Sequence, residues 1–376
     1  MRILFVSDNY NPAETPFNGD SQRTRLLYEA CRRIAEVDVI SFAGEPDRSM
    51  YPGRLKKWIA LLPFISVAAL CPKDSFKEKV VDEAVRKGEY DLIVTRYFYR
   101  AVKCGLWKYR NKLVVDCDDA LPFFFLNQMS PSSALTSRVR LRLSAFKMKR
   151  SARRTVRQMH AAFFAGEPTA KASGGVFLPN IPYYKDGCVD AEMGAPIKRI
   201  LFVGQLEYQP NKEGLSHFLK FIYMPLRERL PNVQMHVVGL INNEELRQYW
   251  QSFPHVTVTG FVDDLKQEYE QSHVVVVPIY RCGATNIKLL EAMAMNRACV
   301  TTNEAYSKMD GRFEKGKSLL VAENDEAFVE ALVTLLTDEQ INLSIAHQGK
   351  AMMDRYYSFD AFCGIVKNAV GIAFLK

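Results

Sequence analysis

The chain has 376 residues, of which 48% are hydrophobic and 24% charged, and its formal net charge is +8. These proportions are those of an ordinary globular protein and exclude a disordered or fibrous chain. One hydrophobic core rarely serves a chain of this length, so we expect two domains.

The cysteine spacing and the first residues of the chain indicate the cellular compartment. The eight cysteines form no Cys-x-x-Cys pair and have no histidine cluster beside them, which argues against a disulfide framework and a metal site. Met1 leads straight into a strand pattern, so no signal peptide is expected. The longest apolar run, Trp58 to Leu70, is broken by Pro63 and is shorter than the roughly 18 residues that cross a bilayer. We therefore expect a cytoplasmic protein.

The first half of the chain alternates strand and helix patterns. Strands are predicted at residues 2–7, 38–41, 91–95 and 113–116. A loop over residues 18–23 carries Gly19 and Arg23, and a helix is predicted to begin near Thr24. This alternation is typical of a doubly wound parallel sheet.

A basic segment lies between Asp119 and Glu167, an interval that contains no other acidic residue. Its arginines and lysines stand at positions 138, 140, 142, 147, 149, 150, 153, 154 and 157. Apolar residues recur at helical spacing from Leu135, which predicts a basic amphipathic helix over residues 135–157. Such a helix suits an anionic membrane surface, at about 1 kcal/mol per basic residue. Equally, its apolar stripe could be domain core. No nucleic-acid partner is expected, because no known nucleic-acid fold accompanies the charges.

The second half repeats the plan of the first. The pentapeptide Arg-Ile-Leu-Phe-Val occurs at residues 2–6 and again at 199–203, each time as the first buried strand of a predicted parallel sheet. Further strands are predicted at residues 234–239, 256–259, 274–277 and 298–301. The polar residues 184–198 between the two halves are the predicted linker.

A helix that follows the strand at residues 274–277 carries the clearest functional signal. It is preceded by Gly283, Ala284, Thr285 and Asn286, whose backbone amides would lie at a helix N-terminus and favour an anion. Lys288 adds a positive charge, and Glu291 lies on the same helical face, placed to accept hydrogen bonds from vicinal hydroxyls. This combination indicates a nucleotide-diphosphate sugar. A solvated charge pair on a helix surface is the alternative.

These residues resemble a known family. The sequence KLLEAMA from Lys288, with CVTTNEA from Cys299, is similar to the donor-site helix of family 4 glycosyltransferases of the GT-B fold. Gly204, Gln205 and Lys212 stand where the family has its phosphate loop. The resemblance implies an α/β protein with two Rossmann-like, doubly wound parallel-sheet domains facing a cleft.

The resemblance also implies a division of the chain. Residues 1–183 would form the acceptor domain, and residues 199–357 the donor domain. Residues 358–376 would be a helix, beginning near Ser358 and ending near Phe374, that crosses back to the first domain. Arg23 and Arg96 are acceptor-side candidates together with Gly19, although a loop glycine is more often a turn former.

Three departures from the family pattern concern the site. Gln205 replaces the usual phosphate-binding arginine, for which Arg23, Arg96 or Arg100 could compensate. Gly283 stands where the family has the first glutamate of its Glu-x7-Glu motif, so the transferred sugar and retention of configuration stay open. The family's His-Asp pair has no histidine here.

An acidic triplet follows the strand at residues 113–116. Asp118 and Asp119 are candidate catalytic residues, together with Lys288, because a carboxylate there could position or activate an acceptor hydroxyl; capping of the next helix is the alternative. Asp116 and Asp118 also form the short Asp-x-Asp motif that holds a metal in GT-A enzymes, but the two-domain plan argues against that fold. The Asp-x-Asp-x-Thr phosphatases are excluded because Ala120 takes the threonine position.

The leading hypothesis is a metal-independent, retaining glycosyltransferase that needs no cofactor. It would move a hexose from a nucleotide sugar to a polysaccharide or lipid-linked glycan acceptor, at the inner face of the cytoplasmic membrane. A nucleotide-sugar epimerase shares the fold but needs a histidine in the cleft. A GT-B domain without activity, which binds a nucleotide sugar or a partner as a scaffold, is the alternative outside enzymes.

Overall fold

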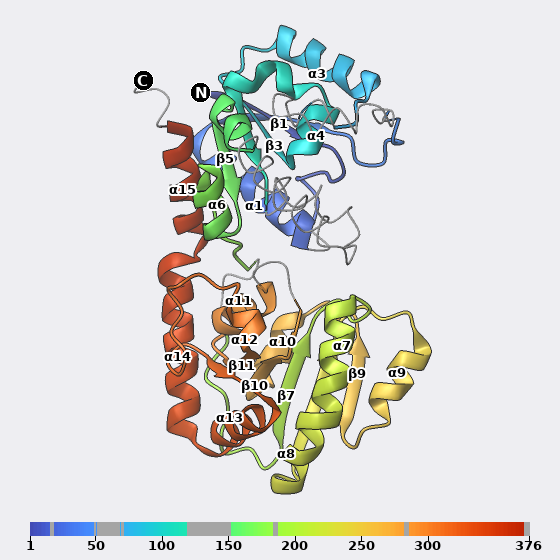
Figure 1. Cartoon of the computed structure of the whole chain (residues 1–376), viewed down its shortest axis with the longest axis vertical. Coiled ribbons are helices and arrows are strands. Elements are labelled where there is room, and N and C mark those ends of the chain that lie inside the picture. The colour runs from blue at the N-terminus through green and yellow to red at the C-terminus, as the bar shows by residue number, and fades with distance from the viewer. Residues whose placement is uncertain are drawn as a thin grey trace, which may run out of the picture. The chain divides into compact units, whose positions relative to one another are not determined.

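The computed structural model describes residues 1–15, 19–48, 50, 68, 71–118, 152–182, 187–281 and 286–371. The chain divides into two compact units: unit 1 contains residues 1–179 and 359–376, and unit 2 contains residues 180–358. Each unit is built on one six-stranded parallel sheet with helices around it (Figure 1). The predicted α/β fold with two parallel sheets is therefore confirmed.

Unit 1 has the strand order β2-β1-β3-β4-β5-β6. The strands are β1 (Arg2–Ser7), β2 (Glu36–Ser41), β3 (Leu92–Arg96), β4 (Leu113–Asp116), β5 (Ala161–Phe164) and β6 (Val176–Phe177). The helices are α1 (Gly19–Ile34), α3 (Ser75–Lys87), α4 (Phe98–Lys103), the 3₁₀ helix η2 (Leu106–Lys112), α6 (Glu167–Ser173) and α15 (Phe359–Gly371). Four of these strands match predictions; β5 and β6 were not predicted.

Unit 2 has the strand order β12-β11-β10-β7-β8-β9. The strands are β7 (Lys198–Val203), β8 (Val233–Val238), β9 (Val256–Gly260), β10 (Val274–Val277), β11 (Ala298–Thr302) and β12 (Leu320–Ala322). The helices are α7 (Gln209–Phe218), α8 (Met224–Arg229), α9 (Glu244–Gln251), α10 (Leu265–Glu270), α11 (Ile287–Ala294), α12 (Asn303–Tyr306), α13 (Asp325–Thr337) and α14 (Glu339–Tyr356). The three-residue β12 is too short to be recognised from its pattern.

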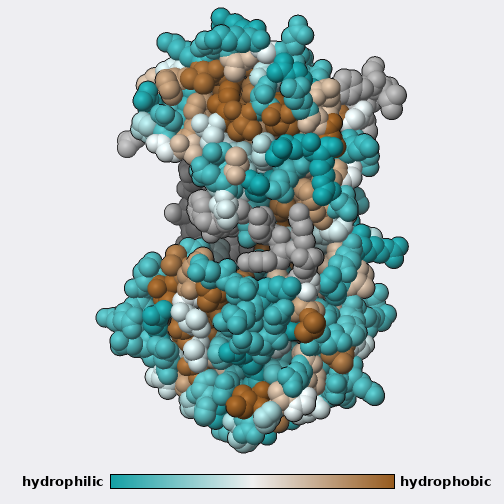
Figure 2. Space-filling view, turned by 180° about the vertical axis from the view of Figure 1, so that it is seen from behind, coloured by the Kyte–Doolittle hydropathy of each residue, from teal (hydrophilic) through white to brown (hydrophobic). Residues whose placement is uncertain are grey.

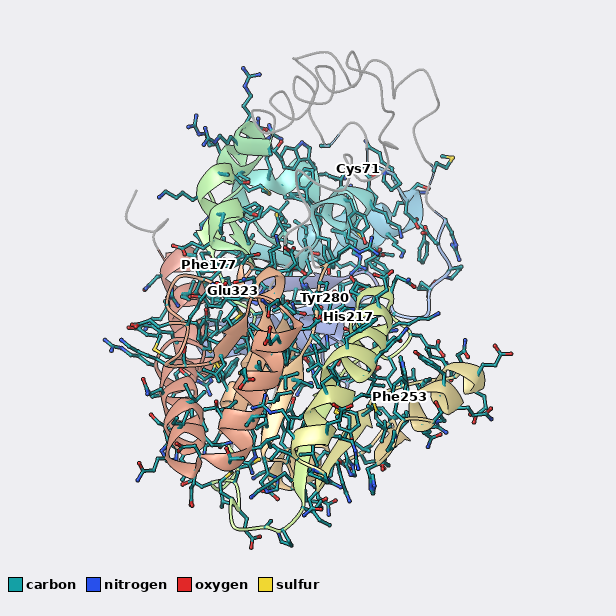
Figure 3. The ribbon with its side chains drawn as sticks, turned by 60° about the horizontal axis from the view of Figure 1, so that its bottom comes forward. Cys71, Phe177, His217, Phe253, Tyr280 and Glu323 are labelled. Carbon is teal, nitrogen blue, oxygen red and sulfur yellow. The ribbon has the colours of Figure 1, made fainter. Side chains whose placement is uncertain are left out.

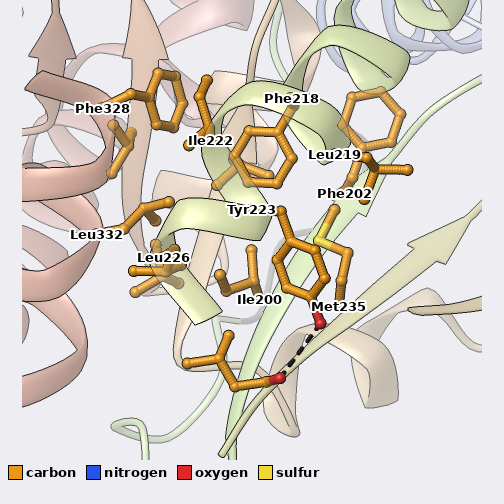
Figure 4. Packing of buried hydrophobic residues seen from close by; sticks show 14 of the residues in the cluster. Ile200, Phe202, Phe218, Leu219, Ile222, Tyr223, Leu226, Met235, Phe328 and Leu332 are labelled. Carbon is orange, nitrogen blue, oxygen red and sulfur yellow. Dashed lines mark hydrogen bonds between the residues drawn. The ribbon is translucent and has the colours of Figure 1, made fainter. Parts of the chain in front are cut away.

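Helices α7 and α8 are one continuous helix with a wide turn, η3 (Leu219–Tyr223), between them. Pro225 lies in the first turn of α8 and has no N–H to donate, which explains why the regular helical bonding is interrupted just before it. The buried face of this turn packs on the sheet through Leu219, Ile222 and Tyr223 (Figure 4). The Tyr223 hydroxyl donates to the carbonyl of Val233, 3.3 Å away, so this buried polar group is satisfied.

The α1 helix begins earlier than predicted. Residues 19–23 belong to the helix rather than to a loop, and Asp20 lies in its first turn, where a negative charge is favourable. Ser21, Arg23 and Thr24 point into the unit and are buried. Buried contacts therefore stabilise the first turn of α1, although its polar residues do not show a helical pattern of apolar side chains.

Helix α15 returns to unit 1 and packs against α1. Arg33 Nη1 lies 2.5 Å from Asp360 Oδ1, and the Arg33 guanidinium lies 4.4 Å from the centre of the Phe359 ring. The last residues, 372–376, fall outside the described part, so the predicted end near Phe374 is not among the described residues.

Most of the basic segment also falls outside the described ranges, as does the apolar run from Trp58 to Leu70 apart from Ala68. Of residues 135–157, the structure describes 152–157, which are helical; Val156 is buried in the unit 1 core, whereas Arg153, Arg154 and Arg157 are exposed. In the described ranges no helix is both long and apolar enough to cross a membrane. Figure 2 shows hydrophobic residues gathered on unit 1 and a mostly hydrophilic face on unit 2 with smaller hydrophobic areas.

Candidate functional site

The strand order of unit 2 marks where a ligand can bind. From β7 the chain continues to β8 on one side, whereas β10 pairs with β7 on the other side. The helices that follow β7 and β10 therefore diverge, and open α/β sheets bind ligands at this switch point, at the carboxyl ends of the strands. Gly204 follows β7 there, and Lys288 lies in the helix that follows β10.

Gly204, Asn211 and Lys288 meet at this edge. A Cβ atom on Gly204 would lie 2.6 Å from Lys288 Cε and 3.0 Å from Asn211 Nδ2, so a larger residue would displace at least the Lys288 side chain from its present place. The Lys288 ammonium lies 3.5 Å from the same point. Asn211 Nδ2 donates to the Gln205 carbonyl at 2.7 Å and so fixes the turn after β7. The site offers a positive charge beside a bare backbone, which suits a phosphate.

Gly239 brings the neighbouring strand end to the same place. Its φ is +148°, and a Cβ there would lie 1.7 Å from the Gly204 carbonyl oxygen. The backbones after β7 and β8 therefore touch directly. This contact holds the Gly204 turn against the sheet.

Glu291 lies one turn beyond Lys288 and is buried. Burial raises its pKa to about 7, although the charge of Lys288 and a hydrogen bond from Tyr269 act in the opposite direction. A buried carboxylate without a full set of donors is ready to accept hydrogen bonds from hydroxyl groups. Ionisation of Glu291 and hydroxyl binding should therefore favour each other.

The other predicted donor residues lie in different settings. Gln205 is exposed, and Lys212 is half-buried with no side-chain hydrogen bond or ion pair in the described part of the chain. Asn286 is the N-cap residue of α11, and its buried Nδ2 has no partner among the described residues. Gly283, Ala284 and Thr285 lie outside the described residues.

The sequence interpretation placed both Asn211 and Lys212 in the segment that resembles the phosphate loop, but selected only Lys212 as a site residue. The buried face of α7 consists of Asn211, Gly214, Leu215 and Phe218. Helical periodicity places Asn211 on that face and Lys212 beside it. The same periodicity, applied to α7, could have identified Asn211.

Two residues that precede the donor loop are tied to α7. The Tyr280 ring lies 4.7 Å from the His217 ring (Figure 3), and His217 Nε2 lies 2.9 Å from each carboxylate oxygen of Asp325. Arg281 Nη2 lies 2.6 Å from Glu213 Oε2. These contacts anchor the chain where it leaves β10.

The switch point of unit 1 lies between β1 and β3, and a buried ion network occupies the carboxyl ends of β3 and β4. Arg96 and Asp116 end these strands and are register partners. Asp116 accepts two hydrogen bonds from Arg23, at 2.7 and 2.8 Å, and one from Arg96 at 2.9 Å. Burial alone would raise the pKa of Asp116, but the charges of Arg23 and Arg96 hold it below its ordinary value.

The predicted acceptor-side residues gather at this edge. Gly19 opens α1, and Arg96 Nη1 lies 2.6 Å from Asp20 Oδ1 in the first turn of that helix. Asp118 Oδ2 lies 2.9 Å from Arg96 Nη2, and Asp119 is outside the described residues. Arg23 and Arg96 are thus paired with carboxylates of unit 1 rather than presented as unpaired cations.

The described ranges contain no group of three or more histidine, cysteine, aspartate or glutamate side chains that could hold a metal ion. The Asp116–Asp118 pair is bound by arginines instead. This arrangement does not resemble a divalent-cation site, because both oxygens of Asp116 and the Oδ2 atom of Asp118 are already paired with guanidinium groups.

Comparisons with known proteins bear on unit 2 first. Residues 197–338 match a family model described as glycosyl transferases group 1. That range includes Gly204, Asn211, Lys288 and Glu291. No curated protein matches the sequence significantly.

Solved structures resemble the whole chain. Sucrose-phosphate synthase from Thermosynechococcus elongatus matches with a TM-score of 0.65 and 14% identity over 100% of this chain and 99% of that one. Anabaena HepE, solved with UDP and glucose, matches with a TM-score of 0.59 and 14% identity over 98% and 99%. The lipopolysaccharide outer core galactosyltransferase WaaB matches with a TM-score of 0.61 and 10% identity over 99% and 100%. The fold is that of GT-B glycosyltransferases.

Proposed function

We propose that this protein is a glycosyltransferase that takes a sugar from a nucleotide-diphosphate donor. The observation that carries the proposal is the contact of Lys288 with the bare backbone of Gly204, at the switch point of unit 2 and inside the range of the family match. A cation at that position can neutralise the charge that develops on a leaving diphosphate.

The donor would be held by residues of unit 2. Lys288 and Lys212 would bind the diphosphate, together with the amides of Gly204, Gln205 and the loop 283–286. Glu291 would accept hydrogen bonds from the ribose hydroxyls. The HepE structure contains UDP and glucose, which supports a uridine nucleotide as the first donor to test.

The acceptor side of the proposal concerns unit 1. A polysaccharide or lipid-linked glycan would bind near Gly19, Arg23, Arg96, Asp118 and Asp119. A hexose would be transferred with retention and without a metal or other cofactor, in the cytoplasm. Residues 135–157 would attach the protein to the anionic inner face of the membrane. Reaction in EDTA, the anomeric configuration of the product and binding to vesicles of anionic lipid test these three points separately.

The first experiment is a thermal-shift screen with uridine, guanosine, adenosine and thymidine diphosphates and their common sugars, in EDTA and in magnesium. One base should raise the melting temperature selectively, and the matching nucleotide sugar should release free sugar slowly. Binding without any sugar release under either condition would favour the scaffold alternative over the enzyme.

The matched variants are Lys288→Ala and Lys317→Ala. Lys317 is an exposed lysine of unit 2 that pairs with Glu314 at 2.6 Å, away from the sheet edge. Donor affinity should fall about 10- to 100-fold in Lys288→Ala, as expected for loss of a charged hydrogen bond. It should be unchanged in Lys317→Ala. Equal affinity in both variants would contradict the site assignment.

A further inference from the structure

Two residues at the carboxyl edge of the unit 1 sheet have a positive φ, which residues other than glycine rarely adopt. Tyr97 follows β3 with φ 60°, and Asp118 follows β4 with φ 54°. The strands β3 and β4 are direct neighbours in the sheet. Positive φ in residues other than glycine is costly and concentrates at functional sites. A strained pair on adjacent strands therefore calls for an explanation.

The surroundings of Tyr97 fix its side chain. Its N–H donates to the Asp116 carbonyl at 2.8 Å, and its carbonyl accepts from the N–H groups of Arg100 and Ala101, both at 3.0 Å. Its ring has the guanidinium of Arg96 at 4.7 Å and that of Arg100 at 4.5 Å. These contacts hold the Tyr97 hydroxyl 3.3 Å from Asp118 Oδ2.

Both side chains that reach Asp118 contact the same oxygen atom. Arg96 Nη2 lies 2.9 Å from Oδ2, and the Tyr97 hydroxyl is the second partner of Oδ2. In the described part of the chain, the Oδ1 atom has no hydrogen-bond partner, and 25% of the side chain is exposed. One oxygen of Asp118 is thus occupied and the other is available.

The titratable groups around Asp118 come from four elements. They are Asp20, Arg23 and Arg100 on the helices α1 and α4, Arg96 and Tyr97 at the end of β3, and Asp116 and Cys117 at the end of β4. Arginine and aspartate charges therefore compensate one another at this edge. Such an edge suits a hydroxyl group better than a second anion, because the arginine charges are already paired.

We propose that Tyr97 and Arg96 are positioning residues that hold Asp118 by its Oδ2 atom and leave Oδ1 to accept a hydrogen bond from the acceptor hydroxyl. The inference rests on the proposed glycosyl transfer and adds the atom that receives the acceptor. In the absence of a glycan, a water molecule takes the place of the hydroxyl. The rate at which free sugar is released from the donor therefore depends on Asp118 Oδ1 in the same way as transfer to a glycan.

Asp118→Asn tests the proposal sharply. Because Arg96 and Tyr97 both donate, the amide oxygen of asparagine would face them, and its NH2 group would take the place of Oδ1. A donor would then stand where the hydroxyl needs an acceptor. Asparagine also tolerates positive φ, so the backbone should keep its conformation.

The experiment measures sugar release from the nucleotide sugar that wild-type protein uses, as kcat and donor KM from pH 5 to 9. The variants are Asp118→Asn, Tyr97→Phe and the control Tyr109→Phe. Tyr109 donates to Asp82 at 2.9 Å in the same unit, which is the same kind of bond away from the sheet edge. We expect kcat to fall about 10²-fold in Asp118→Asn with donor KM unchanged, and to be unchanged in Tyr109→Phe.

Tyr97→Phe separates positioning from a structural role. It keeps the ring between the two guanidinium groups and removes one donor to the ionised carboxylate of Asp118. Loss of this donor leaves the Asp118 carboxylate less well oriented, so kcat should fall about tenfold while donor KM stays unchanged. An unchanged kcat, or a lower kcat with an equal change in donor KM, would overturn the positioning role.

The remaining outcomes distinguish the two proposals. Wild-type kcat in Asp118→Asn would overturn this inference and leave the glycosyltransferase assignment intact. No sugar release by wild-type protein from any donor would overturn the proposed function and this inference with it.

Discussion

Lys288 and Gly204 meet at the carboxyl edge of the unit 2 sheet, where the lysine side chain lies 2.6 Å from the place that a Cβ at position 204 would take. The two residues are far apart in the sequence and meet because β7 and β10 are neighbours in the sheet. A short-range sequence pattern contains no information on this contact. Substitution of the glycine therefore tests the site directly.

Gly204→Ala should weaken donor binding without unfolding the protein. The new methyl group would lie 2.6 Å from Lys288 Cε, which belongs to a flexible side chain that can move away. Displacing the ammonium should lower affinity for the nucleoside diphosphate about 10-fold or more, measured by calorimetric titration.

Gly214→Ala is the matched control for that change. A Cβ at position 214 would lie 2.0 Å from the Pro278 carbonyl oxygen, which is backbone and cannot move aside easily. We expect destabilisation of about 1–3 kcal/mol in urea unfolding. If Gly204→Ala is the less stable of the two, the alanine at 204 acts through the fold rather than through Lys288.

Glu291→Gln should change how stability depends on pH. Burial raises the pKa of Glu291 to about 7 in the folded protein, whereas an unfolded glutamate titrates near 4.3. The contribution of Glu291 to the free energy of unfolding is thus fully present below about pH 4.3 and is lost as pH rises through about 7. Across this window, the free energy of unfolding of wild-type protein should fall by about 4 kcal/mol relative to that of Glu291→Gln.

Urea unfolding of both proteins at pH 4.5, 6 and 7.5 measures this difference. A constant difference between the two proteins across the three pH values would show that Glu291 ionises with an ordinary pKa. Nucleoside diphosphate should also bind wild-type protein more tightly as pH rises through about 7, since the ionised carboxylate accepts two hydroxyls.

Asp116→Ala should destabilise the protein by about 3–5 kcal/mol, because it removes the buried carboxylate that Arg23 and Arg96 share. The exposed pair Arg229–Glu330 serves for comparison, and Glu330→Ala should have no measurable effect on stability. The pKa of Asp116 is lowered, so its contribution is present above pH 3.8 and is lost as pH falls through the folded pKa. Thermal unfolding from pH 3 to 7 checks both statements; equal losses in the two variants would contradict the first.

Arg297→Met should release the segment that enters unit 2. The buried Arg297 guanidinium donates to the carbonyls of Val189 and Tyr269 at 2.7 Å and of Glu270 at 3.0 Å. Methionine leaves these oxygens without donors, which should cost at least about 3 kcal/mol. Hydrogen exchange of residues 187–193 should accelerate in this variant and not in the control Arg355→Met, which changes an exposed arginine of α14. Unchanged exchange in Arg297→Met would show that other contacts hold the segment.

Local patterns determined most of the fold. Continuous apolar runs such as Val274–Val277 are strands because their side chains can be buried on both faces of a sheet, and this property is visible in a few residues. The same local reasoning placed Lys288 and Glu291 on one helix. It could not detect β6 or β12, since two or three residues contain no measurable period, and it placed the start of α1 too late because that turn is held by contacts with distant residues.

Tertiary structure decided the partners of the charged side chains. Arg23 and Asp116 are 93 residues apart, and their pairing depends on the order of strands in the sheet. The sequence showed Arg23 and Arg96 beside the acidic residues Asp116 and Asp118 without their partners, but the sheet decided that these four side chains pair with one another. It also decided that Asn211, and not Lys212, stands beside Gly204. Charge pairing depends on distances of a few ångströms between residues far apart in the chain, and only the folded backbone sets those distances.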